Sequence, residues 1–561
     1  MACPNHTSIC TDVVTFAFSG PAQDGEPSKR SLFIDAQDPS RALNAAQFKL
    51  LVRALIAGLR FHRVQRGDCV LVHTRNNVLY PALFLAIVGA GGVYMGSNPA
   101  SQPFELEHTI DIAEPRIIIT CSDALRTVLA VASGKGIEGD RIFLLDELAV
   151  GNVIRFLNNP AEPILAPLKG SGGWHMDFMH LLSWGESDWV VINDERTSMR
   201  TPAAMFSTSG TGGLPKAAIL SHHSLISWHL SVYYEVPYEV SRLIAIPMFH
   251  NFSSIWTHFF PIRYGHPLYV LPEFNLSELL KAVFKYQVTE TYLVPFMIQT
   301  LNQSFLPVNQ FLASLRYVGV AGAPIDRESM LKFQSLLQPN ACAAQLWGMT
   351  EVGIALQNRY SLPHERCDIG SVGKLLPGYE ARLVDADTGR TIRDDDCSGQ
   401  LHIRGPGVLL AYKGSINGRD DDGWFATGDV AYVKRGQYFI VGRNKELIKV
   451  RGWQVAPAEI EAVLLKHPKI RDVAVLGVTC PDGSSEVPRA YVVPVSAAAQ
   501  PKAQEVYEYA RERLAGYKAL DGGVVLVDHI PRTASGKIRR VELSRMNSQR
   551  ERMARILAQR I

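Results

Sequence analysis

The sequence predicts an α/β protein: a large N-terminal domain of layered α/β sheets with a small β-barrel-like lobe, and a small C-terminal α/β domain. From residue 31 to 151, short apolar runs typical of buried strands alternate with stretches whose apolar residues recur at helical spacing. Such alternation is typical of sheets layered against helices. With 561 residues, 47% of them hydrophobic and 20% charged, the chain can bury large cores.

The strands and helices of the large domain can be placed in order. A helix is expected from Asn44 to Arg60, where apolar residues recur at helical spacing. The looser stretch from Pro160 to Thr201, which contains Trp and Gly, is interpreted as a surface connection. The expected strands share short, apolar, β-branched or aromatic runs, at residues 70–72, 117–119, 244–246, 268–270, 291–293 and 317–319.

The pattern of predicted secondary structure changes after these elements. From Gly370 to Ile440, short β segments separated by turns indicate the barrel-like lobe. Near Gly442 the composition becomes polar, as in a linker between domains, and a compact α/β tail follows. We therefore divide the chain into an N-terminal domain, residues 1–442, and a C-terminal domain, residues 443–561.

Composition also excludes classes of function. A formal net charge of +3 is too small for a nucleic-acid partner, so anion binding must be local. The eight cysteines show no paired spacing, and the N-terminus lacks the order of a secretory signal, which together indicate a cytoplasmic protein. The apolar stretch from Val78 to Gly96 contains Pro81 and several glycines. We expect a buried helix followed by a buried strand there, and no membrane span.

Residues 207–216, with the sequence STSGTGGLPK, are typical of a phosphate-binding loop. Glycines let backbone N–H groups approach an anion, and the hydroxyl groups and Lys216 supply further donors. The loop lies between two apolar, strand-like runs, which suits a cover over a nucleotide. Neither G-x-x-x-x-G-K-[ST] nor G-x-G-x-x-G is present. A glycine-rich surface turn is the alternative interpretation.

Seven motifs occur in the order found in adenylate-forming enzymes. They are the phosphate loop and residues 321–324, 347–351, 426–429, 442–449, 452–455 and 531–537. Through these motifs, residues 31–540 resemble the 4-coumarate:CoA ligase-like acyl-CoA synthetases. The resemblance implies ATP, Mg²⁺ and coenzyme A as cofactors and a small-molecule carboxylic acid as substrate. The acid and ATP would form an acyl-adenylate, which the CoA thiol would then attack.

The resemblance implies an extended nucleotide site. Cations and N–H donors must surround the α-phosphate because a carboxylate has to approach it there. Asp429 would accept the ribose hydroxyls, which Arg443 would also approach, and Trp347 would face the adenine and the acyl group. A turn role for Asp429 and a core role for Trp347 are the alternatives. The residues implied in ATP or AMP binding are Ser207, Thr208, Ser209, Gly210, Thr211, Gly212, Gly213, Lys216, Gly322, Ala323, Trp347, Gly348, Met349, Thr350, Asp429, Arg443 and Lys537.

Four residues would act in catalysis by the same resemblance. Thr350 would donate its hydroxyl to the α-phosphate, and Lys537 would stabilise charge during adenylate formation. Lys449 and Gln454 lie on the segment that would enter the site for the second step, when the mobile C-terminal domain has turned about a hinge near Lys445. Each lysine has solvated surface charge as its alternative role.

The remaining expected sites hold the metal, the acid and CoA. Glu351 would carry Mg²⁺, which prefers oxygen ligands, unless it is an ordinary solvated carboxylate. Gly452 and Trp453 would face CoA. Leu346 and Ile354 depart from the usual residues of the family, so hydroxycinnamate specificity does not carry over. We expect an apolar or aryl acid rather than acetate. The residues implied in the acid pocket are His250, Leu346 and Ile354, with core packing as the alternative for His250.

Other functions remain open at this point. The enzyme could instead be an acyl-AMP ligase that loads a carrier protein, or a luciferase-like enzyme that oxidises the same adenylate. A nucleotide-binding regulator without turnover is a further alternative. A downstream acyl-accepting enzyme or carrier protein is a possible partner. The final residues, Gln559-Arg560-Ile561, faintly resemble the peroxisomal Ser-Lys-Leu signal, so the peroxisome is the alternative to the cytoplasm.

Overall fold

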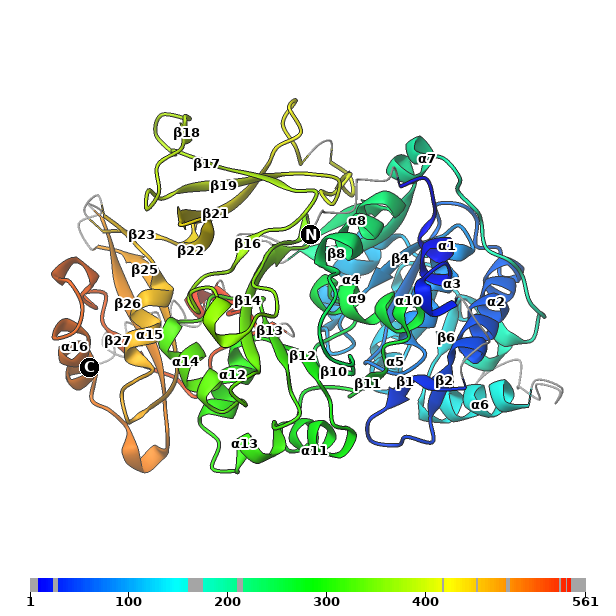
Figure 1. Ribbon diagram of the computed structural model, residues 1–561, viewed down its shortest axis with the longest axis horizontal. Coiled ribbons are helices and arrows are strands. Elements are labelled where there is room, and N and C mark those ends of the chain that lie inside the picture. The colour runs from blue at the N-terminus through cyan, green and yellow to red at the C-terminus, as the bar shows by residue number, and fades with distance from the viewer. Residues whose placement is uncertain are drawn as a thin grey trace.

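Three parts of the chain lie side by side in the molecule (Figure 1): two large sheets with their helices, a β-rich lobe, and the C-terminal domain. The computed structural model describes residues 9–23, 29–159, 175–208, 215–415, 418–450, 453–480, 485–533, 536–540 and 542–545. The predicted α/β class is confirmed, with both large sheets mainly parallel and interleaved with helices.

The eight-stranded sheet carries the strands that flank the predicted phosphate loop. Strands β8 and β9 pair antiparallel, with Thr208 opposite Lys216, so the described ends of the loop face each other. The sheet order is β20 (Ala411–Tyr412), β9 (Lys216–Ser221), β8 (Pro202–Thr208), β4 (Val93–Gly96), β3 (Cys69–His73), β5 (Ile117–Thr120), β6 (Ile142–Leu144) and β7 (Met176–Asp177).

The nine-stranded sheet positions two further predicted motifs, residues 321–324 and 347–351. Its central strands β12, β13 and β14 are parallel, while β15 turns back antiparallel to β14. The sheet order is β16 (Lys374–Leu375), β15 (Gly353–Gln357), β14 (Cys342–Met349), β13 (Tyr317–Val320), β12 (Glu290–Leu293), β10 (Arg242–Ile244), β11 (Leu268–Val270), β1 (Ser31–Asp35) and β2 (Ala42–Asn44).

The helices of the large domain cover these sheets (Figure 1). They are α1 (Val13–Phe18), α2 (Ala45–Phe61), α3 (Tyr80–Gly89), α4 (Pro103–Ala113), α5 (Ser122–Gly134), α6 (Glu147–Asn158), α7 (Glu195–Arg200), α8 (His222–Val232), α9 (Asn251–Thr257), α10 (Phe260–Tyr264), α11 (Leu276–Tyr286), α12 (Pro295–Asn302), α13 (Val308–Phe311) and α14 (Arg327–Ser335).

Two predictions for the first 100 residues are confirmed. The helix expected from Asn44 is α2, which begins after Asn44 because that side chain accepts the N–H of Gln47 in a capping box. The apolar stretch 78–96 forms the fully buried helix α3 and then the buried strand β4. No helix in the described part of the chain is both long and apolar enough to cross a membrane.

The β-rich lobe is an open sheet and not the barrel-like structure expected. Its five strands run in a single row, so the two edge strands do not pair with each other to close a barrel. The order is β18 (Thr391–Ile392), β17 (Glu380–Val384), β19 (Gly399–Arg404), β21 (Phe425–Lys434) and β22 (Gln437–Arg443). Short, turn-rich strands are shared by open sheets and barrels, so the sequence texture does not separate the two.

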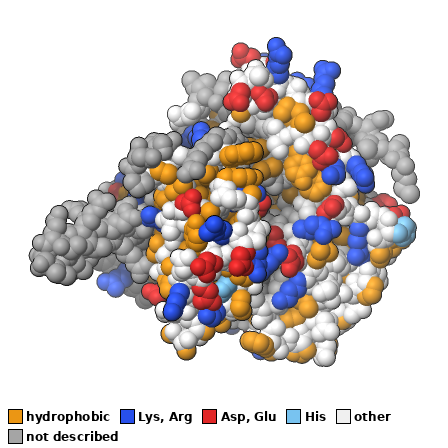
Figure 2. Space-filling model, turned by 90° about the vertical axis from the view of Figure 1, so that its left-hand side faces the viewer, with side chains coloured by type: hydrophobic (Ala, Val, Ile, Leu, Met, Phe, Trp, Pro, Cys, Tyr) orange, Lys and Arg blue, Asp and Glu red, His pale blue; other side chains and the backbone are white. Residues whose placement is uncertain are grey.

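In its described residues, the C-terminal part combines two small sheets with helices that pack on them. Strand β23 (Ile448–Val450) pairs with β24 (Trp453–Val455). A second sheet has the order β25 (Ile470–Thr479), β26 (Glu486–Pro494) and β27 (Val524–Leu526), packed with α15 (Pro457–Leu464) and α16 (Ala503–Arg511). Figure 2 looks onto this side of the molecule and shows acidic and basic side chains interspersed, in keeping with the small net charge.

The expectation that residues 160–201 form a surface connection is wrong for part of that stretch. The short 3₁₀ helix Phe178–Leu182 is buried along its whole length. Its backbone reaches α2 because residue 58 is glycine: a Cβ there would lie 1.9 Å from the carbonyl oxygen of Leu181. A stretch that contains Trp and Gly can thus be buried when a glycine on the facing helix admits its backbone.

This contact predicts the effect of adding one methyl group to α2. Gly58→Ala should lower the free energy of unfolding by about 2 kcal/mol, because the overlap outweighs the roughly 1 kcal/mol gain in helix propensity. Gly134→Ala is the control, since Gly134 ends α5 and a Cβ added there would meet no atom within 4 Å. Thermal and urea unfolding of both variants measure the effect. Equal stability of the two variants would contradict the proposed overlap.

Candidate active site

Asp429 lies where the large sheet meets the lobe. Its carboxylate accepts a hydrogen bond from the indole Nε1 of Trp347, at the end of β14, at 2.8 Å. On the other side, Arg443 Nε lies 3.4 Å from Asp429, from the opposite position on the neighbouring strand β22. Burial raises the pKa of Asp429, and Arg443 and then Trp347 oppose that rise. The carboxylate is therefore held in one orientation by partners from two sheets.

Lys537 reaches this carboxylate from the C-terminal domain. Its charge interacts with Arg443, Asp429 and Glu351, and the residue is half-buried. Burial lowers the pKa of Lys537, Arg443 lowers it further, and the carboxylates oppose the shift. Its backbone is fixed by a tight turn, in which Gly536 has φ of +80° and donates its N–H to the carbonyl of Thr533 at 2.8 Å.

Glu351 is a second buried carboxylate, just beyond the end of β14. Tyr412 of β20 donates its hydroxyl to Glu351 at 3.0 Å, and burial raises the pKa of the carboxyl group. The ammonium of Lys216, at the described end of the phosphate loop, lies 4.9 Å from the centre of the Tyr412 ring. Tyr412 thus connects the phosphate loop to Glu351 by a cation–π contact and a hydrogen bond.

Glu351 fits the role expected of a magnesium ligand. It offers carboxylate oxygen, which Mg²⁺ prefers, close to the cationic residues expected to hold phosphates. Within the described ranges, no group of three His, Cys, Asp or Glu side chains is placed to hold a metal ion. An ion at Glu351 would therefore complete its coordination with phosphate oxygens and water, as Mg²⁺ commonly does.

The remaining residues of the nucleotide set lie on β8, on β14 and in the loop after β13. Thr350 is buried beside Glu351, and Thr208 is buried at the end of β8. Gly348 is required by packing, because a Cβ there would lie 2.2 Å from the carbonyl oxygen of Gly353 on β15. The others are Ser207 on β8, Met349 on β14, and Gly322 and Ala323 between β13 and α14.

His250 caps the start of α9 and lies within electrostatic range of Lys537. Its Nδ1 accepts the backbone N–H of Phe252 at 3.2 Å, so the neutral ring carries its proton on Nε2. Burial, and to a lesser extent Lys537, lowers the pKa of His250 to about 3. The imidazole is therefore a neutral N–H donor at physiological pH. Leu346 and Ile354 are buried on β14 and β15, against which α9 packs.

The residues expected to face CoA are not part of this cluster. Trp453 is 58% exposed and stacks on Tyr517 with ring centres 4.7 Å apart. Lys449 is also exposed, and its backbone N–H donates to Glu486. Ser209, Gly210, Thr211, Gly212, Gly213, Gly452 and the side chain of Gln454 lie outside the described part of the structure.

Contacts between the C-terminal domain and the large domain accompany the placement of Lys537. Arg539 lies 2.9 Å from Glu105 on α4, and Lys466 forms an ion pair with Glu328 on α14. Within the C-terminal domain, Arg540 is bound to Glu446 at 3.0 Å and to Glu461 at 3.2 Å.

Sequence reasoning missed Tyr412 and Arg540. Tyr412 lies outside the seven motifs, and no sequence spacing indicates that β20 returns from the lobe to pair with β9. Arg540 follows directly after the last motif, where it looks like one of many arginines. A buried arginine requires carboxylate partners, so only the fold, which brings Glu446 and Glu461 to it, reveals its role.

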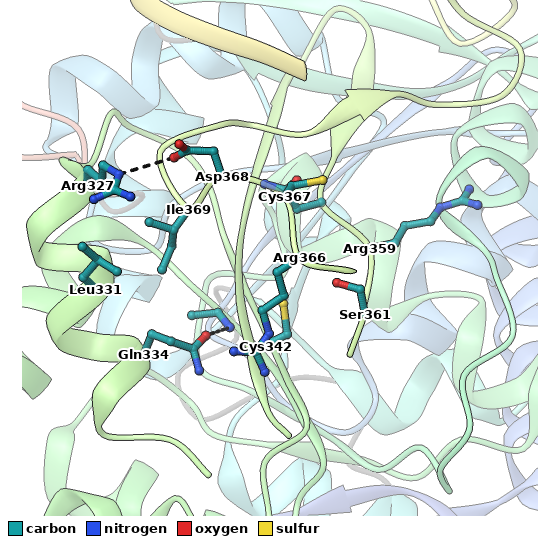
Figure 3. Close-up of a pocket in the computed structure, with 12 residues that line it drawn as sticks. Arg327, Leu331, Gln334, Cys342, Arg359, Ser361, Arg366, Cys367, Asp368 and Ile369 are labelled. Carbon is teal, nitrogen blue, oxygen red and sulfur yellow. Dashed lines mark hydrogen bonds and ion pairs between the residues drawn. The ribbon is translucent and has the colours of Figure 1, made fainter. Parts of the chain in front are cut away.

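A separate pocket of about 250 Å³ lies between α14 and the segment 358–369 (Figure 3). Arg327 and Asp368 form an ion pair at 3.5 Å across its rim, and Gln334 accepts the backbone N–H of Ala343 at 2.8 Å. None of the residues that line it belongs to the predicted site.

Comparison with known families identifies the class of protein. Residues 22–413 match the AMP-binding enzyme family, and residues 459–537 match the AMP-binding enzyme C-terminal domain. The chain therefore belongs to the AMP-binding enzyme family. The predicted class, adenylate-forming enzymes of the acyl-CoA synthetase type, is confirmed.

Two relatives narrow the comparison further. The chain is 53% identical to nicotinic acid-CoA ligase olcI of Penicillium canescens, over 98% of this chain and 100% of that protein. It is 51% identical to nicotinic acid-CoA ligase pyr1 of Aspergillus fumigatus, over 98% of each chain. Among solved structures, ATP-bound MatB from Rhodopseudomonas palustris aligns with a TM-score of 0.77 at 25% identity, covering 95% of this chain and 98% of that one.

The lowered pKa of Lys537 predicts that the rate of adenylate formation depends on pH. Its lowered pKa means that the ammonium is protonated below that pKa and loses its charge, as pH rises, earlier than an ordinary lysine would. Adenylate formation should therefore fall on the alkaline side of the profile. Lys537→Arg keeps the charge and should move that fall to higher pH. The measurement is acid-dependent pyrophosphate release from about pH 6 to about pH 10. An alkaline limb at the same pH in both proteins would assign it to another group.

Proposed function

We propose that this enzyme is an ATP-dependent aryl-CoA ligase whose substrate is a small aromatic carboxylic acid, with nicotinic acid as the first candidate. The observation that carries the proposal is the cluster of Lys537, Glu351 and Asp429 beside the neutral His250. It combines a cation and a hydrogen-bond donor where two anions have to meet. The names of the relatives from Penicillium canescens and Aspergillus fumigatus support the choice of acid.

The first half-reaction joins the acid to ATP. An oxygen of the substrate carboxylate attacks the α-phosphorus, and the bond from that phosphorus to the pyrophosphate oxygen breaks. We assign to Lys537 the stabilisation of both the attacking and the departing oxygens, and to Thr350 a hydrogen bond to the α-phosphate. Mg²⁺ held at Glu351 would supply positive charge to the phosphates.

The second half-reaction transfers the acyl group to CoA. The thiol, after losing its proton, attacks the carbonyl carbon of the acyl-adenylate, and AMP leaves. We propose that residues 443–561 turn as a unit about Lys445 between the two steps. Lys449, Gly452, Trp453 and Gln454 would then face the site in place of Lys537. Lys449 and Trp453 are exposed, whereas Lys537 is half-buried and interacts with Asp429 and Glu351, which supports this exchange.

The wall of the acid pocket favours a single ring over a longer acid. Trp256 and Tyr292 stack with ring centres 3.9 Å apart, and Phe252 meets Tyr292 edge to face. Leu346 packs against the same Tyr292 ring across Gly319. We infer that these large side chains limit the length of the acid that the site accepts.

Localisation is part of the same proposal. We assign the enzyme to the cytoplasm on the spacing of its cysteines. Peroxisomal import through residues 559–561, which lie outside the described part of the structure, is the alternative.

A panel of acids tests the substrate and the acceptor together. Nicotinic, benzoic, phenylacetic, 4-coumaric and acetic acids are assayed for pyrophosphate release, with and without CoA. We expect turnover with the single-ring acids to exceed that with acetic acid by at least about tenfold, because only a ring fills the aromatic pocket. A preference for acetic acid over every aromatic acid would refute the pocket assignment. Pyrophosphate release without a CoA thioester would favour a carrier protein as acceptor.

A pair of lysine variants tests the proposed rotation of the C-terminal domain between the two half-reactions. Lys537→Ala should slow adenylate formation by about 10²-fold, in the range for loss of a preorganised charge stabiliser. The same variant should convert synthetic acyl-AMP and CoA to thioester at nearly the wild-type rate. Lys449→Ala, its matched counterpart, should show the reverse pattern. Equal impairment of both half-reactions in each variant would refute the rotation.

A further inference from the structure

Helix α9 runs from the reaction centre into the aromatic wall of the acid pocket. His250 caps its first turn next to Lys537, and Trp256 lies in its last turn. The helix packs against β14 and β15, which carry Leu346 and Ile354. A side chain of α9 can therefore contact the part of a substrate that lies beyond its carboxylate.

Trp256 is fixed in this wall. Its ring lies parallel to that of Tyr292, with centres 3.9 Å apart and an interplanar angle of 11°. Tyr292 is itself held in place, since its hydroxyl lies 3.5 Å from Glu290, which forms a buried ion pair with Arg242 at 2.8 Å. The indole therefore presents its edge in a defined direction.

The indole N–H of Trp256 lacks a hydrogen-bond acceptor among the described residues, although the side chain is only 2% exposed. This is unusual, because buried donors are nearly always hydrogen-bonded and an unmade bond is costly. Two other buried tryptophans of the chain follow the rule. Trp347 donates to Asp429 at 2.8 Å, and Trp228 donates to the carbonyl of Gly407 at 2.7 Å.

We propose that the N–H of Trp256 recognises the ring nitrogen of a pyridine carboxylic acid, and so selects it over the carbocyclic acid of the same shape. This inference rests on the proposed function. A pyridine nitrogen offers one lone pair in the ring plane and no hydrogen, whereas an indole nitrogen is a donor only. Benzoic acid places a C–H group at that position and leaves the donor unpaired. A site built around a buried donor rejects the analogue that lacks the acceptor.

Asn251 is the competing candidate on the same helix. Its side chain is 4% exposed, and its carboxamide oxygen has no partner within the described ranges. The amide lies in the first turn of α9, next to His250 and the reacting carboxylate. Trp256 lies about a turn and a half further along, stacked on the Tyr292 ring that Phe252 also contacts, and therefore further from the reacting carboxylate. We therefore assign recognition of the ring to Trp256.

The experiment compares nicotinic and benzoic acids by kcat/KM for pyrophosphate release. In Trp256→Phe, which keeps an aromatic ring but has no N–H, the preference for nicotinic acid should fall by about tenfold or more. Because both acids would pack against the ring at position 256, the readout is the ratio of their two kcat/KM values, in which a loss of packing common to both acids cancels. Trp256→Leu, which removes the indole N–H without adding another donor, provides a second test if Trp256→Phe does not fold. Trp228→Phe is the matched control, because it removes a partnered indole N–H outside the pocket and should keep the preference.

The possible outcomes separate a failure of the proposed substrate class from a failure of the role assigned to Trp256. If the wild-type enzyme activates neither acid, the proposed substrate class is wrong. If the wild-type enzyme prefers nicotinic acid and the folded Trp256 variants keep that preference, the role of Trp256 is refuted while the function stands. A preference lost in Asn251→Leu but retained in Trp256→Phe would transfer recognition to the amide and would also refute the role of Trp256.

Discussion

The site depends on the buried carboxylate of Asp429. Burying a charge is costly unless it is paired and hydrogen-bonded, and here the partners come from three parts of the chain. Trp347 comes from the large sheet, Arg443 from the strand that leads out of the lobe, and Lys537 from the C-terminal domain. Because one carboxylate requires all three, the sheet, the lobe and the C-terminal domain are brought to a common point.

The same electrostatic balance prepares the site for two anions. Lys537 is close enough to His250 to contribute to the low pKa of the ring, so a cation and a neutral N–H donor lie near each other at the site. Neither is neutralised by proton transfer to the other. An incoming carboxylate would find positive charge and a hydrogen-bond donor there, without any rearrangement of those groups.

Much of this arrangement was accessible from the sequence, because it depends on local patterns. The capped helix after Asn44 and the buried helix and strand of residues 78–96 follow from periodicity and composition. The ordered motifs also identified the family correctly. Phosphate-loop residues 209–213 and Gly452 stay predictions, as do the chemical roles of the site residues, since they require a bound substrate or a measured rate.

Other features depend on contacts between distant segments, which no local pattern encodes. Packing partners far away in the chain set three of these features. They are the open edge of the lobe, the burial of Phe178–Leu182 against Gly58, and the return of Tyr412 to the phosphate loop. Trp256 is the clearest case. Any buried tryptophan satisfies the apolar pattern of α9, and only the three-dimensional surroundings reveal that its N–H has no acceptor in the described structure.

The ion pairs between the domains have an energetic consequence. Arg539 and Glu105 are each about one-third exposed, and Lys466 and Glu328 are more exposed still. Such surface pairs contribute at most about 1 kcal/mol each and weaken as salt is added. These pairs therefore stabilise only weakly the position that the C-terminal domain has in the structure. If the C-terminal domain turns as proposed, ionic strength would shift the balance between its two orientations without altering any group that touches the substrate.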